Sequence, residues 1–241
     1  MPINLKDTKI DQDFILRCLI YGVSGVGKTT LAATFPQPIF MFDLDHKFKC
    51  LVGKGIDIDI ESFDAGTKDN AGKEYARLLK VWKEVKLNTK YKTVIFDSLS
   101  MLDGMVQRWC LDQAGKSGLV VPDIQLWGHI KDHYQFLFSE LNHVAWKKNL
   151  IVTAHEDYVV EDESKVHQVL PLVSTKIRAN LPMYFEETYY IKAMVEAGKT
   201  VRRMFYAPTG KALANTQVLK GVGHIDDATY DKILAVARGG K

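Results

Sequence analysis

The sequence predicts an α/β protein with a mainly parallel, twisted sheet and helices on both faces. Five apolar, β-rich runs alternate with segments of helical periodicity, a pattern typical of parallel sheets. A glycine-rich segment, GVSGVGKTT, directly follows the first run and precedes a helix-compatible stretch. The chain has 241 residues, of which 46% are hydrophobic and 25% charged, so it is long enough to bury one sizeable core.

Each expected strand is a short run rich in β-branched and aromatic residues. The five runs are FILRCLIY, PIFMFD, KTVIFD, NLIVTA and EETYYIKAMV, at 14–21, 38–43, 92–97, 149–154 and 186–195. The alternating segment IDIDI at 56–60 fits a short extra strand. Helical patterns fill the intervals, and the expected helices cover 28–34, 73–86, 100–114, 129–147 and 227–238.

Two regions interrupt the alternation of strands and helices. The glycines and proline of 114–128 predict a loop, and 155–174 predicts a β-hairpin with a charged tip. Loops that face ligands emerge at the carboxyl ends of parallel strands. Both regions are therefore expected at the same edge of the sheet as the glycine-rich segment.

The glycine-rich segment matches the phosphate-binding pattern G-x-x-x-x-G-K-[ST]. Glycines let successive backbone amides point into one concavity, and the following helix adds the positive end of its dipole. We expect Lys28 to contact the β- and γ-phosphates of a bound nucleotide and the Thr29 hydroxyl to ligate Mg²⁺. A glycine-rich turn without a ligand is the alternative. The expected cofactor-binding residues are Gly22, Val23, Ser24, Gly25, Val26, Gly27, Lys28, Thr29 and Thr30.

Acidic side chains follow two of the expected strands. Asp97 ends the apolar run TVIFD, which favours a place in the Mg²⁺ shell beside Thr29. The next residue is Ser98, which cannot serve as a general base. We therefore expect the base that activates water to come from FMFDLDH, where Asp45 is preferred and Asp43 is left to brace the strand end. Surface or capping roles are the alternatives for these acids.

The run LIVTAHE places Thr153, His155 and Glu156 at the end of another strand. A polar side chain between a phosphate loop and a metal-binding acid can contact the γ-phosphate and transmit its loss to the following loop. His155 is the preferred candidate for this role. A histidine that only satisfies hydrogen bonds at a strand end is the alternative.

Composition and charge narrow the class of protein. The polar start MPINLKDTKIDQD and the lack of a long apolar run predict neither a secretory segment nor a membrane span, so a cytoplasmic protein is expected. Three widely spaced cysteines favour neither a disulfide framework nor a zinc ribbon. From Lys192 onward, nine Lys or Arg face four Asp or Glu, whereas the chain as a whole carries only +3. This basic segment fits either a nucleic-acid partner or an ordinary solvated face.

With these residues placed, the chain resembles the RecA-like ATPases, in particular the small core-only phage single-strand-annealing proteins. The resemblance covers about 14–206 and rests on GVSGVGKTT, MFDLDH, TVIFDS, IVTAHE and PLVSTKIRANLPMYFEETYY. It implies a single ATPase domain, with 207–241 as a basic extension, that binds single-stranded DNA as a filament or ring. It further implies pairing of complementary strands in phage recombination, in the host cytoplasm. Asp45 replaces the longer glutamate common in that group, which predicts either slow hydrolysis or a differently placed water.

The resemblance also implies roles for residues outside the nucleotide site. In RecA-like proteins two loops line the DNA channel, and here they correspond to 114–128 and 156–176. The candidates for DNA contact are Lys116, Trp127, Tyr158, Lys165, Lys176 and Arg178. The candidates for a cation that completes a neighbouring subunit's site are Arg202, Arg203 and Lys211.

Two other functions stay open on the sequence alone. One is a nucleotide-dependent switch that docks a replication or packaging protein, a reading favoured by the acidic stretch 156–163. The other is a small-molecule kinase, which an arginine-rich lid would favour and which the sequence does not display. A single-strand-binding protein is a further expected partner of the annealing function.

Overall fold

A mixed sheet organises the computed structural model, which describes residues 10, 14–67, 69–119, 121–143, 146–161, 166–221 and 223–239. Within those ranges the sheet has nine strands, in the order β3-β2-β4-β5-β1-β7-β8-β9 with β6 paired to β5. The strands are β1 (Arg17–Gly22), β2 (Ile39–Asp43), β3 (Ile58–Ser62), β4 (Thr93–Asp97), β5 (Asn149–Glu161), β6 (Val166–Pro171), β7 (Glu187–Glu196), β8 (Lys199–Phe205) and β9 (His224–Asp226).

The run from β3 to β7 is parallel, and β8 and β9 extend it in antiparallel fashion. Every residue of β2 and β4 is buried, as strands covered on both faces require. The predicted α/β class with a mainly parallel sheet is confirmed, and the five expected strands and the extra strand near 56–60 are all present. The strands β8 and β9 were not predicted.

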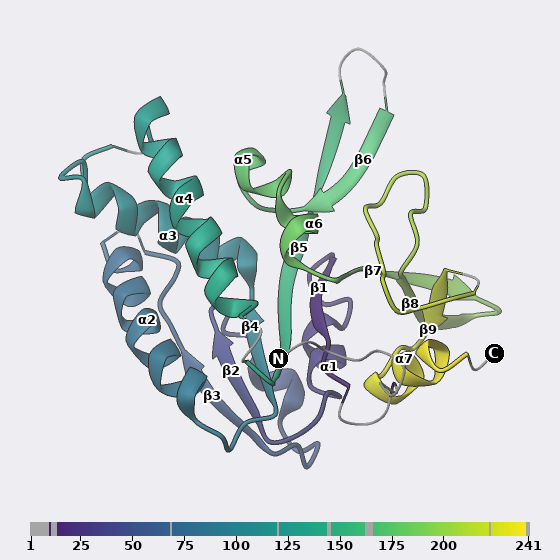
Figure 1. The fold of residues 1–241 in the computed structure, drawn as a ribbon. Coiled ribbons are helices and arrows are strands. Elements are labelled where there is room, and N and C mark those ends of the chain that lie inside the picture. The colour runs from purple at the N-terminus through teal and green to yellow at the C-terminus, as the bar shows by residue number, and fades with distance from the viewer. Residues whose placement is uncertain are drawn as a thin grey trace, which may run out of the picture.

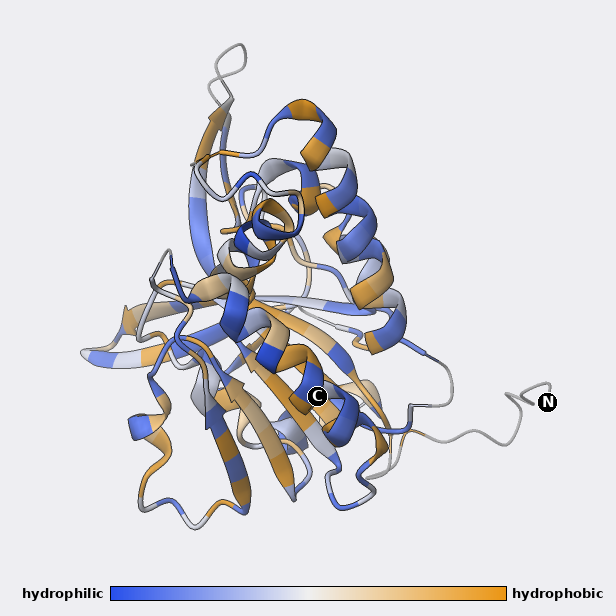
Figure 2. Ribbon diagram, turned by 90° about the vertical axis from the view of Figure 1, so that its left-hand side faces the viewer, coloured by the Kyte–Doolittle hydropathy of each residue, from blue (hydrophilic) through white to orange (hydrophobic). Residues whose placement is uncertain are grey.

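Helices cover both faces of the sheet (Figure 1). They are α1 (Lys28–Ala32), the 3₁₀ turn η2 (Phe48–Leu51), α2 (Ala71–Leu87), α3 (Leu99–Gln113), α4 (Ile124–Leu141), α5 (Thr175–Arg178), α6 (Leu181–Tyr184) and α7 (Tyr230–Ala237). Alternate residues of β1 enter different cores: Leu19 and Tyr21 pack with α2, α3 and α4, whereas Cys18 and Ile20 pack with α1 and α7. Figure 2 shows largely hydrophobic strands in the sheet and helices in which hydrophobic and hydrophilic residues alternate.

The helix α4 corrects two predicted boundaries. Asp123 accepts a hydrogen bond from the Leu126 backbone N–H at 2.9 Å and so caps the helix start. The helix therefore begins at Ile124, inside the segment predicted as a loop, and ends at Leu141 rather than near 147. Its predicted core face is correct, since Ile130 and Leu137 are among its buried side chains.

The predicted hairpin at 155–174 is confirmed, with its tip at 162–165 outside the described residues. β5 pairs with its parallel neighbours as far as His155 and then continues as one arm of the hairpin, from Glu156 opposite Pro171. Figure 1 shows the hairpin rising above the sheet. One strand thus belongs both to the central sheet and to the protruding hairpin.

The last part of the chain packs on the sheet. The Tyr230 ring lies 4.8 Å from the Phe35 ring, and Ile233 and Leu234 of α7 are buried in the hydrophobic core that also contains Leu31 of α1. Residues 224–239 therefore contribute to the same hydrophobic core as the phosphate-loop helix. The helices that the structure describes are too short or too polar to cross a lipid bilayer.

Candidate nucleotide-binding site

The loop between β1 and α1 requires glycine at two of its positions. A Cβ atom on Gly22 would lie 2.3 Å from the Ile191 carbonyl oxygen. Gly27 has φ of +107°, and a Cβ there would lie 3.1 Å from the Arg202 side chain. Larger residues would push the loop off β7 and β8. The predicted pattern therefore adopts the close-packed turn that phosphate binding needs.

Lys28 lies at the start of α1 with its side chain buried. Its Nζ donates hydrogen bonds to the carbonyl oxygens of Gly22 at 3.0 Å and Val23 at 2.9 Å. Burial lowers the pKa of Lys28, while the carboxylates of Asp97 and Asp45 oppose this effect. The ammonium group is thus held inside the loop.

Asp97 lies at the carboxyl end of β4 and is almost fully buried. The Thr29 hydroxyl donates to Asp97 Oδ2 at 2.6 Å, and the Thr153 hydroxyl donates to Oδ1. β5 lies between β1 and β4, and this order brings the three side chains together. Burial raises the pKa of Asp97 even though the two hydroxyl donors lower it.

Thr29 and Asp97 together fit a magnesium ion. Mg²⁺ prefers hard oxygen donors, usually one or two carboxylates together with phosphate oxygens and water. The buried carboxylate and the adjacent hydroxyl provide such oxygens. When bound, the ion would neutralise charge on the phosphates.

Asp45 lies in the turn after β2 and is tied to two other elements. The Ser98 hydroxyl donates to Asp45 Oδ1 at 2.9 Å, and His155 Nε2 lies 2.7 Å from Oδ2. The His155 backbone N–H donates to Ser100 Oγ at 2.9 Å. Burial raises the pKa of Asp45, but the hydrogen bonds from His155 and Ser98 outweigh it, so the pKa is lowered. Asp45 is therefore an ionised carboxylate at neutral pH.

Asp43 has different surroundings from Asp45. It is fully buried and accepts hydrogen bonds from Ser62 Oγ at 2.8 Å and from the Lys47 backbone N–H at 3.3 Å. Its hydrogen-bond partners differ from those of Asp45, so the two acids do not share surroundings. Asp43 braces the strand end, and Asp45 faces the cavity beside the phosphate loop.

That cavity has a volume of about 140 Å³. Most of its lining was predicted from the sequence: the loop residues Ser24, Gly25, Gly27, Lys28, Thr29 and Thr30 with Asp45, Asp97 and His155. Lys47 and Cys50 also line it and were not predicted as site residues. Their only sequence signal was their place in the turn after a strand that ends in candidate acids.

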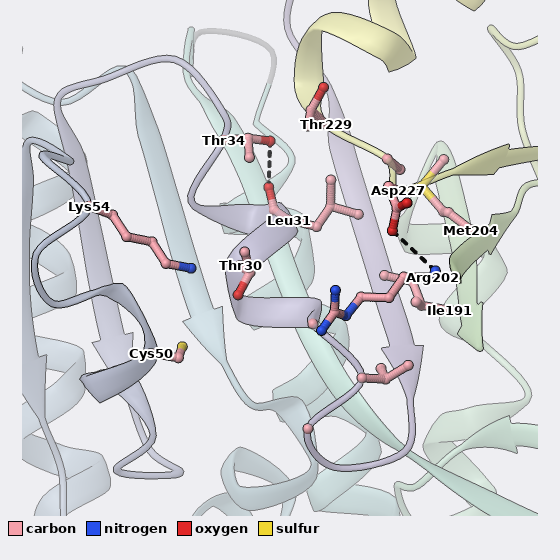
Figure 3. A pocket seen from close by; sticks show the side chains of 14 residues that line it. Thr30, Leu31, Thr34, Cys50, Lys54, Ile191, Arg202, Met204, Asp227 and Thr229 are labelled. Carbon is pink, nitrogen blue, oxygen red and sulfur yellow. Dashed lines mark hydrogen bonds between the residues drawn. The ribbon is translucent and has the colours of Figure 1, made fainter. Parts of the chain in front are cut away.

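A second cavity, of about 430 Å³, lies on the other side of the phosphate loop (Figure 3). The two cavities share Gly25, Gly27, Thr30 and Cys50. In Figure 3, Cys50 and Lys54 face the Arg202 side of the cavity across α1. The Arg202 backbone N–H donates to Asp227 Oδ1 at 3.2 Å.

The cations predicted to act on a neighbouring subunit have distinct places. Arg202 lies against the phosphate loop of its own chain, beside Gly27. Arg203 is paired with Asp226 at 2.6 Å and with Glu196 at 3.0 Å. Lys211 is exposed. Action on a neighbour stays a prediction for all three residues, although the ion pairs of Arg203 already use its guanidinium group.

The DNA-contact candidates separate into paired and unpaired groups. Lys116 forms an ion pair with Asp123 at 2.5 Å, and Arg178 pairs with Asp157 at 2.6 Å. Both cations therefore have acidic partners inside the protein, and contact with DNA stays a prediction for them. Tyr158 is 59% exposed and stacks on His167. Trp127 and Lys176 line one shallow cavity near the start of α4, and Lys165 lies outside the described residues.

A phosphate loop after a parallel strand, with its lysine, threonine and facing buried acid, defines a P-loop NTPase. The AAA domain model matches residues 15–214, and the chain therefore belongs to this ATPase family. Among solved structures, the chain is similar to a KaiC-like protein from the hyperthermophilic archaeon Pyrococcus horikoshii, with 15% identity and a TM-score of 0.41. That match covers 79% of this chain and 77% of the other. No curated protein matches significantly.

Proposed function

We propose that this chain is a magnesium-dependent ATPase that binds single-stranded DNA and promotes the pairing of complementary strands. The observation that carries the proposal is the contact between Asp45 and His155 at 2.7 Å. His155 lies in β5 where the central sheet ends and the exposed hairpin begins. A change at the nucleotide therefore has a direct structural route to the hairpin.

The proposed hydrolytic step uses residues of this chain in separate roles. Lys28 and the loop amides hold the phosphates, while Thr29 and Asp97 hold Mg²⁺. Asp45 orients and polarises the attacking water as an ionised carboxylate. His155 hydrogen-bonds Asp45 and fixes its orientation. Loss of the γ-phosphate changes the charge that this pair faces.

The hairpin supplies the proposed DNA contact. Tyr158 presents an exposed aromatic ring, and bases stack on such rings without regard to sequence. Asp157 would repel a phosphate backbone, but its ion pair with Arg178 offsets its charge. Lys176 is the exposed cation of the adjacent α5. We propose that the subunits work as a filament or ring. In such an assembly the hairpins of successive subunits would contact successive parts of one DNA strand.

A second candidate function is a switch that docks a replication or packaging protein. Exposed apolar side chains near the same end of the molecule favour it, since Ile124 is 86% and Met183 is 79% exposed. Exposed apolar groups are typical of protein contacts rather than of DNA contacts. This function predicts hydrolysis that responds to a protein and not to DNA.

The test is steady-state ATP hydrolysis by the pure protein with and without single-stranded DNA, together with annealing of complementary oligonucleotides. We expect DNA to stimulate hydrolysis, and Lys28→Ala and Asp45→Asn to abolish the stimulated rate. DNA affinity should fall steeply as salt concentration rises. Hydrolysis that DNA leaves unchanged, with no DNA binding at low salt, would refute the DNA function and favour the protein-docking switch.

A further inference from the structure

Lys47 lies at the rim of the cavity that also contains Asp45, Asp97 and His155. Its Nζ donates to Ser24 Oγ in the phosphate loop at 3.0 Å and lies 3.9 Å from Asp45 Oδ2. Its backbone N–H donates to the buried Asp43 carboxylate at 3.3 Å. Asp43 therefore fixes the backbone from which the Lys47 side chain reaches the loop.

Among the described residues that line this cavity, the lysines are Lys28 and Lys47. Lys28 is buried within the loop, whereas the Lys47 side chain is exposed over about half of its surface. After the effect of burial and of the two nearby acids, the charge of Lys47 is a further cause that lowers the pKa of Lys28. The two ammonium groups thus repel each other, and an anion between them would relieve this repulsion.

The other candidate cations do not share this position. Arg202 lines the neighbouring cavity, and Arg203 is engaged with Asp226 and Glu196. The Lys47 side chain is 51% exposed, and its flexible four-carbon chain can move from Ser24 to a bound phosphate without backbone change. The hydrogen-bond acceptor of Lys47, the Ser24 hydroxyl, is a weaker partner for an ammonium group than a phosphate oxygen, and the Asp45 carboxylate is 3.9 Å away, beyond hydrogen-bond distance.

We infer that Lys47 is a second phosphate-contacting cation. When a nucleoside triphosphate is bound, the Lys47 side chain moves away from Ser24 and binds the terminal phosphate of the nucleotide held by the same chain. This inference rests on the proposed ATPase function and goes beyond it in one respect. The charge that the sequence assigned to a neighbouring subunit is supplied in cis. Basal ATP hydrolysis by one subunit therefore does not require a neighbouring subunit. The pairing of DNA strands can still require assembly of subunits into a filament or ring.

The experiment compares Lys47→Met with Lys49→Met, which removes an equal charge two residues away at an exposed position that does not line the cavity. Calorimetry measures affinity for ADP and for a non-hydrolysable ATP analogue, both with Mg²⁺. We expect Lys47→Met to weaken analogue binding and to lower kcat/KM by about tenfold to a hundredfold, the effect of losing one charge-assisted hydrogen bond. ADP binding should change far less, Lys47→Arg should restore most of the loss, and Lys49→Met should match the wild type.

A bracing role through Ser24 gives a different pattern. If Lys47 only holds the phosphate loop, Ser24→Ala loses as much affinity as Lys47→Met, and ADP and the analogue are affected equally. Either result overturns the inference, as does a Lys47→Met variant that matches Lys49→Met. Thermal unfolding of each variant checks that the fold is retained.

Rates at several protein concentrations test the cis assignment. We expect the basal rate per subunit of the wild type to be constant across dilutions. A rate that rises steeply with protein concentration would assign the completing cation to a neighbour and overturn the inference. The binding data separate this inference from the proposed function. The wild type could bind the ATP analogue more tightly than ADP, lose this preference in Lys47→Met, and yet hydrolyse no ATP. That result would refute the proposed ATPase function and leave the inference about Lys47 intact.

Discussion

Two buried acids in the same sheet, Asp97 in β4 and Glu187 in β7, have similar burial but different surroundings. Burial is the first cause that raises the pKa of each. Asp97 accepts from the hydroxyls of Thr29 and Thr153 and lines the cavity at the phosphate loop. Its partners are short, rotatable groups at the edge of an open space.

Glu187 instead accepts hydrogen bonds from three donors in its own part of the sheet and the following segment. It accepts from Tyr189 OH at 2.8 Å, from Thr216 Oγ1 at 2.5 Å and from the Gln217 backbone N–H at 2.8 Å. These bonds hold the segment around 216–219 against the sheet. Burial and a raised pKa therefore do not by themselves mark a functional acid. The cavity that Asp97 lines at the phosphate loop distinguishes it.

The largest expected effect separates the two acids by activity. Asp97→Asn should lower Mg²⁺-dependent hydrolysis roughly a thousandfold, since several kcal/mol of charge stabilisation by the ion are lost. Glu187→Gln should hydrolyse ATP at nearly the wild-type rate. Asp97→Asn should unfold at no lower temperature than the wild type at pH 7, because the change removes a buried charge. A strongly destabilised Asp97→Asn would show that the acid is structural, like Glu187.

A smaller effect concerns Asp45, a third acid whose pKa is lowered. The hydrogen bond from His155 is the largest effect that lowers the pKa of Asp45 against the effect of burial. His155→Ala removes this bond, so the pKa of Asp45 should rise. We expect kcat to fall about tenfold to a hundredfold and the acidic limb of the pH profile to move to higher pH. DNA stimulation should be lost as well. A lowered rate with an unshifted acidic limb would contradict the assignment of Asp45 as the base.

In contrast to the buried acids, Tyr158 of the β5–β6 hairpin is exposed. Tyr158→Ala should weaken binding of single-stranded DNA by about 1 to 3 kcal/mol for each base that stacks on the ring. Tyr158→Phe keeps the ring and should bind like the wild type. Fluorescence anisotropy with a labelled oligonucleotide measures both affinities. Equal binding by all three proteins would place the DNA elsewhere.

The smallest effect is on stability. The folded-state pKa of Glu187 lies above its usual value of 4.5, so the folded protein keeps this proton longer than the unfolded chain does. Its contribution to stability is therefore full below pH 4.5 and declines as pH rises through the folded-state pKa. Glu187→Gln should remove this decline, with an effect of about 1 kcal/mol on the free energy of unfolding. Denaturant unfolding of both proteins at pH 4.5 and pH 7 measures this effect. If the free energy of unfolding changes with pH equally in Glu187→Gln and in the wild type, the raised pKa of Glu187 is contradicted.

The sequence predicted the parts of the site that local patterns determine. The phosphate loop has a fixed spacing, and Asp97 follows a fully apolar strand, so their positions follow from short-range rules. The choice of Asp45 over Asp43 was also made from the sequence, but the contacts of Asp45 with Ser98 and His155 were not, because those residues lie 53 and 110 positions further along the chain. The cis position of Arg202 depends on pairing between β7 and β8, about 175 residues beyond the loop, and no local pattern encodes it.

The start of α4 shows a second limit of local patterns. Glycines and a proline in 114–128 indicated a loop, and the helix start capped by Asp123 within the same segment was not predicted. Paired charges were also invisible in the sequence. Arg178 and Asp157 are 21 residues apart, and only the return of the hairpin onto α5 brings them together.

β5 is thirteen residues long and does not break where it leaves the sheet. From His155 to the end of β5 the backbone extends by about 20 Å at the usual rise of a strand. The strand can therefore act as a lever with its pivot at the nucleotide site. A rotation of about 3° at His155 displaces the far end of β5 by about 1 Å, by the same strand geometry. The loss of one phosphate could in this way be converted into movement at a distance, without any change of secondary structure.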